Sequence, residues 1–127
     1  MQFDLVSPER RLASVEATSV LIPGAEGDMT VMADHAPVIS TLRPGILKVE
    51  GAENAEYVVT GGFAEINASG VTVLAEMAVP AGEADAGMID ALLDKAREAV
   101  ASAEGAAKDM ADKQLADLEA LKVEANL

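Results

Sequence analysis

The hydrophobic period of this chain changes near Pro80, and that change constrains the fold more than any other feature. Before Pro80, short apolar or alternating runs (FDLV, ATSVLI, MTVM, GILKVE, EYVVT, FAEIN and VTVLAEM) are separated by the turn signals PGAEGD, RPG, EGAEN, TGG and NASG. The run GVTVLAEM alternates strictly and predicts a strand with Val71, Val73 and Ala75 on one side. Strand-length runs at this close spacing are typical of a small antiparallel sandwich or barrel.

After Pro80 the apolar residues recur with a helical period. PAGEADAG contains several helix breakers and indicates a linker. Asp85 stands where a helix N-cap is expected, and Gly105 where the first helix would stop. The apolar stripe of this helix contains Met88, Leu92, Ala96 and Val100, widened by Ile89 and Leu93. A second helical stretch has its apolar side at Ala111, Leu115, Leu118 and Leu121.

A short link between two helices favours an antiparallel pair. The sequence therefore predicts an α+β fold: an N-terminal antiparallel β-sandwich over residues 1–82, followed by a C-terminal antiparallel α-helical hairpin over residues 83–127. Half of the residues are hydrophobic, which is enough for a core, but the chain has only two Phe, one Tyr and no Trp. We expect the core to be packed from Val, Ile, Leu, Met and Ala.

Composition excludes several classes of function. The net charge of −13 disfavours binding to a nucleic-acid backbone and to anionic lipid headgroups. With no cysteine and one histidine, the chain lacks the ligands of a Cys-based or multi-histidine metal site. The first residues do not have the pattern of a signal peptide, and no apolar stretch reaches the roughly 18 residues that a membrane span needs. We expect a cytoplasmic protein with no cofactor and no direct insertion into lipid.

Asp34 and His35 are the one pair that suggests catalysis, and a stand-alone hydrolase is the alternative they raise. Adjacent residues on an extended chain point to opposite sides, so Asp34 is poorly placed to orient the ring of His35. The serines lie in no recognisable nucleophile elbow. We therefore expect a turn or interface histidine whose ring bonds a nearby backbone group, followed by an extended entry into the next strand at Pro37.

Three turn segments carry further candidates. VTGGF lacks the lysine and hydroxyl of a phosphate loop, so we expect a bend or bulge between two strands. RPG predicts a type II turn with Gly45 at its third position, and leaves Arg43 either solvated or free to dock a carboxylate of a partner. PGAEGD, with Glu26 and Asp28, is either a solvated turn or a binding loop.

The runs EGDMTVMADHAPVISTLRPGILKV and VTGGFAEINASGVTVLAE, followed by a helical hairpin, resemble the epsilon subunit of bacterial F-type ATP synthase. The resemblance implies a non-catalytic subunit of the central stalk that links the gamma subunit to the ring of membrane c subunits and turns with them, coupling proton flow to ATP synthesis. It implies a c-ring-facing loop at Glu26, Gly27 and Asp28. It also implies a gamma-facing surface with His35, Ala36, Pro37 and Arg43, and a location at the cytoplasmic face of the bacterial inner membrane.

The hairpin departs from the family in two ways. Relatives carry a Leu/Ile-Asp-x-x-Arg-Ala motif that helps bind ATP; here Asp85 is retained, but Met88 and Ile89 occupy the arginine and alanine positions. From residue 81 to residue 127 the hairpin carries five basic and eleven acidic residues, a difference of −6, which disfavours the inhibitory docking of an extended hairpin on an acidic segment of the beta subunit. We expect weak or absent ATP sensing and inhibition. A regulatory module that senses nucleotide is the alternative, with the alpha and beta subunits as its further partners.

Overall fold

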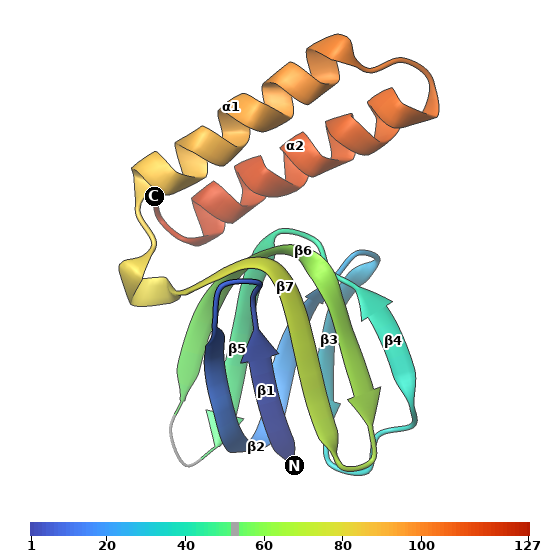
Figure 1. Cartoon of the computed structure of the whole chain (residues 1–127), viewed down its shortest axis with the longest axis vertical. Helices are drawn as coiled ribbons and strands as arrows, with labels where there is room; N and C mark the ends of the chain where they lie inside the picture. The colour runs from blue at the N-terminus through green and yellow to red at the C-terminus, as the bar shows by residue number, and fades with distance from the viewer. Residues whose placement is uncertain (52–53) are drawn as a thin grey trace.

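A computed structural model describes residues 1–51 and 54–127, and in them the chain forms a β-domain followed by two helices (Figure 1). The predicted turn EGAEN includes residues 52–53, which lie outside the described residues. The strands are β1 (Gln2–Val6), β2 (Arg11–Gly24), β3 (Gly27–Met32), β4 (Val38–Thr41), β5 (Gly45–Gly51), β6 (Ala55–Asn67) and β7 (Gly70–Pro80). A 3₁₀ turn, η1 (Ala81–Glu83), leads to the helices α1 (Ala86–Ser102) and α2 (Ala106–Glu124).

The strands form one sheet that closes on itself. Its order is β1-β7-β6-β5-β2-β3, with β4 paired to β6 and with β1 paired to β2 as well as to β7. The predicted fold class, a β-sandwich followed by a helical hairpin, is confirmed, but the pair β1–β7 is parallel. A ring of five strands has five pairings, and an odd ring cannot alternate direction throughout. One parallel pair is therefore required by the closure itself.

Strand β6 differs from the sequence prediction. EYVVT and FAEIN were predicted as two strands, yet they form one strand, and TGG lies inside it rather than between strands. Gly61 and Gly62 have φ of 59° and 93°, so the strand bends there while its register with β7 continues. A Cβ on Gly62 would overlap the carbonyl oxygen of Leu74. Glycine at this position serves the bend and the close approach of β7.

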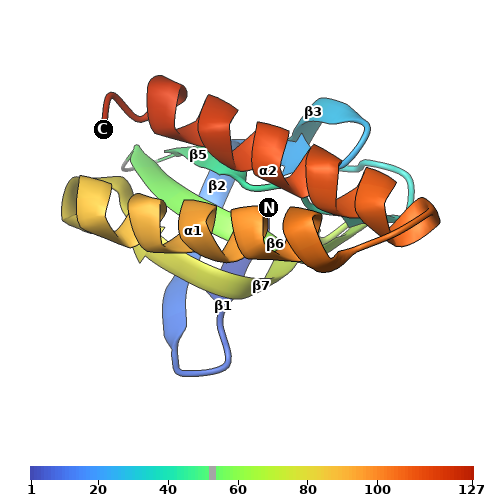
Figure 2. The ribbon, with the colours of Figure 1, turned by 90° about the horizontal axis from the view of Figure 1, so that it is seen from above.

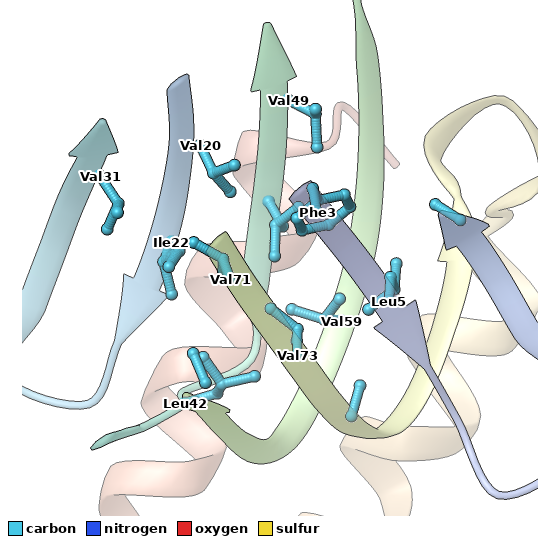
Figure 3. Packing of buried hydrophobic residues seen from close by; sticks show 14 of the residues in the cluster. Phe3, Leu5, Val20, Ile22, Val31, Leu42, Val49, Val59, Val71 and Val73 are labelled. Carbon is cyan, nitrogen blue, oxygen red and sulfur yellow. The ribbon is translucent and has the colours of Figure 1, made fainter. Parts of the chain in front are cut away.

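The core lies inside the closed sheet and is built almost entirely from aliphatic side chains (Figure 3). Phe3 and Leu5 of β1 are completely buried, and Val71, Val73 and Ala75 of β7 are at most 4% exposed. The predicted alternation of β7 is thus confirmed. Burial of each such side chain contributes about 1.5–3 kcal/mol.

The two helices run antiparallel above one end of the sheet (Figures 1 and 2). Asp85 is the N-cap of α1, as predicted, because its Oδ1 accepts a hydrogen bond from the backbone N–H of Met88 at 2.8 Å. The first helix ends at Ser102, and Gly105, with φ of 62°, instead precedes α2 as its N-cap.

The seam between the helices and the sheet is centred one residue away from the predicted stripe. Ile89, Leu93 and Ala96 are buried, whereas Met88 and Leu92 are only partly buried. Leu118 and Leu121 of α2 and Val58 of β6 complete the cluster. Lys122 near the end of α2 donates to Asp90 near the start of α1 at 2.6 Å, so an ion pair joins the open end of the hairpin.

We expect Gly62→Ala to lower the free energy of unfolding by about 2 kcal/mol or more, because alanine is strained at positive φ and its Cβ meets backbone. Urea denaturation of the whole chain measures this difference. Gly82→Ala is the matched control, since a Cβ at Gly82 meets no atom within 4 Å; its effect should stay within about 0.5 kcal/mol. Equal stability of the two variants would contradict the role given to the bend.

Candidate functional site

Glu26, Gly27 and Asp28 form an exposed corner at the turn between β2 and β3. The turn is tight, since Gly24 pairs with Gly27 across two residues, and Gly27 has φ of 143°. Arg43 fastens this corner: its Nη1 donates to the carbonyl of Gly24 at 2.6 Å, and its Nη2 pairs with the carboxylate of Asp28. Arg43 thus braces this turn, while Glu26, Gly27 and Asp28 remain exposed to solvent.

The surroundings of Arg43 bear on two predictions. Asp28 and Arg43 were predicted on two different surfaces; an ion pair joins their side chains, and the partner that each one faces stays a prediction. RPG is not a type II turn, because Gly45 lacks the positive φ that such a turn requires and already belongs to β5. Glycine is needed there for another reason: a Cβ on Gly45 would lie 2.6 Å from the Cβ of Pro23.

A groove of about 560 Å³ separates this corner from β4. Residues 25–29 line one wall, and residues 38–41 line the other. Ile39 in the second wall is 70% exposed, and Met32 at the end of β3 is 61% exposed. The groove thus combines the carboxylates of Glu26 and Asp28 with the apolar side chains of Met29, Val38 and Ile39, while Met32 lies outside its lining.

His35 lies just beyond the other end of β3, in the loop of residues 33–37 that leads to β4. Its Nδ1 donates to the carbonyl of Ala36 at 2.7 Å, which is the backbone bond expected of a turn histidine. Asp34 adopts φ of 65°, and its N–H donates to the carbonyl of Ala68 at 3.4 Å. Among the described residues, no hydrogen bond joins the Asp34 carboxylate to the His35 ring, and no group of three metal-ligating side chains occurs.

The three residues at the position of the ATP motif have structural roles. The Asp85 carboxylate is occupied as the helix cap, Met88 is partly buried, and Ile89 is fully buried against the sheet. Met88 and Ile89 pack into the seam of the hairpin while Asp85 stays exposed at the helix start. None of the three side chains offers a donor to a phosphate. The ion pair between Lys122 and Asp90 was not predicted, because no spacing rule relates residues on two different helices.

The described chain thus consists of a closed β-sandwich with exposed polar corners and a capped helical hairpin packed on one end of it. The family model described as ATP synthase, Delta/Epsilon chain, beta-sandwich domain matches residues 1–81. This chain belongs to that family.

Relatives of nearly equal length agree with this assignment. The chain is 61% identical over 126 residues to an ATP synthase epsilon chain of Fuscovulum blasticum, covering 98% of this chain and 95% of the relative. It is 54% identical over 128 residues to the epsilon chain of Rhodobacter capsulatus, covering 100% and 97%. The relatives are non-catalytic accessory subunits, and this confirms the prediction that the chain has no active site of its own.

Two solved structures have similar folds. One is in Euglena gracilis mitochondrial ATP synthase (OSCP/F1/c-ring), with 28% identity, a TM-score of 0.72, and coverage of 96% of this chain and 79% of that one. The other is in the central stalk/c-ring of Tetrahymena thermophila mitochondrial ATP synthase. It has 16% identity, a TM-score of 0.75, and coverage of 100% and 96%, and supports the fold alone.

We expect Arg43→Leu to lower the free energy of unfolding by about 1–2 kcal/mol, because it removes two charge-assisted hydrogen bonds from a partly buried corner. Thermal unfolding of the whole chain measures the effect. Arg97→Leu is the control: among the described residues, the side chain of Arg97 pairs with Asp94 alone, and that pair is exposed. Its loss should cost less than about 0.5 kcal/mol. If the two variants are equally stable, Arg43 does not stabilise this corner.

Proposed function

We propose that this epsilon chain is a rotor subunit of the central stalk of an F-type ATP synthase, joining the gamma subunit to the c ring and transmitting rotation driven by proton flow. Its family membership and its similarity at 28% identity to a chain of an F1/c-ring assembly support this role. Residues 1–82 would dock on the rotor as one rigid body, and residues 83–127 would form the appended hairpin.

The observation that carries the proposal is the presence of fixed polar elements at both ends of β3. At one end, Glu26, Gly27 and Asp28 form the c-ring-facing corner, with Arg43 as its internal brace. At the other end, His35, Ala36 and Pro37 form the gamma-facing loop. A subunit that transmits torque must bind its neighbours through a surface that does not deform. A closed sheet provides such a surface, and many modest polar contacts on it can add up to a stable interface.

The same arrangement favours a peripheral position at the cytoplasmic face of the bacterial inner membrane. No described helix is both long and apolar enough to cross a bilayer. The acidic surface disfavours anionic lipid. Membrane association would therefore depend on protein contacts with the c ring.

Glu26→Lys tests the c-ring-facing corner without breaking the Arg43–Asp28 pair. We expect tagged E26K to recover about tenfold less c subunit than the unmodified chain from gently solubilised membranes, because one reversed charge disrupts a complementary contact. Mass spectrometry of the recovered chains measures this amount. Glu98→Lys, on the exposed face of α1, is the matched control and should recover normal amounts. Recovery of neither gamma nor c subunits by the unmodified chain would overturn the proposed function itself.

The hairpin is expected to regulate weakly. Deletion of residues 84–127 should change the ATP hydrolysis rate of the assembled complex by less than about twofold, because the acidic hairpin does not dock among the catalytic subunits. Calorimetry of the whole chain with up to about 1 mM ATP should show no binding heat. A large rise in hydrolysis on deletion, or ATP binding that Met88→Ala abolishes, would favour the nucleotide-sensing alternative.

A further inference from the structure

We infer that the free edge of β3 binds an extended, basic segment of a neighbouring rotor subunit by adding it as a further β-strand. This inference rests on the proposed function and specifies one contact of the corner that Glu26 and Asp28 begin. It concerns backbone pairing along β3, which is distinct from side-chain contacts at the corner.

The register of β3 identifies which of its backbone groups are free. In an antiparallel pair, residues that exchange both hydrogen bonds alternate with residues that exchange none. Pro23 has no N–H, so Pro23 and Asp28 must form a pair that exchanges no hydrogen bonds. The register continues without a shift to Met32. The N–H and C=O groups of Asp28, Thr30 and Met32 therefore point away from β2.

Nothing in the described residues covers that edge. Within residues 1–51 and 54–127, β3 pairs only with β2. Beyond it lies the groove, whose other wall is β4. The N–H of Ala25 donates to the carbonyl of Thr41 at 2.8 Å, so the turn before β3 contacts the end of β4 and the two strands are joined at that end.

Edge strands of soluble proteins are normally protected against pairing with other chains. The usual devices are an edge lysine or proline, a bulge, or a very short strand. β4 is four residues long and follows Pro37, so it is protected. β3 has six residues, GDMTVM, with no lysine, no proline and no shift of register. Its one charged side chain, Asp28, is at the first end of the strand and is paired with Arg43. Its outward positions end in Met32, which is 61% exposed. Such an edge is suited to strand addition.

The acidic residues around β3 favour a basic segment as its partner strand. Glu26 and Asp28 lie at the start of β3 and Asp34 lies just beyond its end, while the nearby Arg43 is already bonded to Asp28. A second copy of this chain would pair antiparallel, and Glu26 and Asp28 of one copy would then approach Asp34 of the other. Like charges disfavour that dimer. An extended segment with apolar side chains in its middle and lysine or arginine near its ends complements the edge.

Amide hydrogen exchange in the free chain and in the assembled ATP synthase tests the inference. We expect the amides of Thr30 and Met32 to exchange about tenfold or more slowly after assembly. The amides of Met29 and Val31, which bond to β2, should be slow in both states. Side-chain docking alone would not produce this alternation. If the amides of Thr30 and Met32 exchange as fast in the assembled complex as in the free chain, edge pairing is wrong while the proposed function stands. If the chain does not assemble into the complex at all, both the inference and the proposed function are wrong.

Thr30→Lys and Thr30→Glu form a matched pair that leaves the backbone N–H in place. Sedimentation of each purified variant checks that it remains a folded monomer. T30K should bind the complex lacking this subunit about tenfold more weakly, and T30E should bind as the unmodified chain does or better. If the two variants bind equally well, the segment that pairs with β3 is not basic. A dimer of the unmodified chain that T30K dissociates would also contradict the inference, because a second copy would then occupy the edge.

Discussion

The fold depends on strand β1, which pairs on both of its sides. It is antiparallel to β2 and parallel to β7, and these pairings close the sheet into a ring. Its side chains Phe3 and Leu5 are completely buried, so the strand that closes the ring also fills its centre. Loss of this strand would leave β2 and β7 as open edges and expose the core at once. The sandwich is therefore expected to unfold as one cooperative unit.

Closure also explains why the two layers need a glycine bend. β6 runs for thirteen residues and pairs with β4, β5 and β7. At Gly61 and Gly62 it turns from the part that pairs with β5 to the part that pairs with β4. One continuous strand thus connects the hairpin end, where Val58 packs on the helices, with the turn of Asn67 and Gly70 near residue 34. Force applied at one end passes through covalent backbone to the other.

Local patterns predicted the elements better than their connections. Alternation identified the buried face of β7, and cap chemistry identified Asp85, because both depend on neighbours in sequence. A glycine in the sequence does not reveal why glycine is needed at that position. Gly62 combines a positive φ with a close approach of backbone, Gly45 lies against Pro23, and Gly27 has a positive φ in a turn. The Arg43–Asp28 and Lys122–Asp90 pairs could not be predicted, since each joins residues that only the closed fold brings together. The family resemblance supplied what single motifs could not, namely the family to which the chain belongs.

The packing of the hairpin on the sandwich favours this folded form over one in which the helices extend away. Ile89, Leu93, Leu118 and Leu121 are each at most 3% exposed, and extension of the helices would return these side chains to water. Each exposed side chain costs about 1.5–3 kcal/mol, so a partner must supply an interface of comparable quality before extension becomes favourable. The Lys122–Asp90 pair adds little by itself, because both side chains are partly exposed. If the partner surface is acidic, as the family resemblance implies, repulsion from a hairpin of charge −6 adds to the cost of exposing the seam. The apolar seam and the net charge thus act in the same direction, and both oppose release.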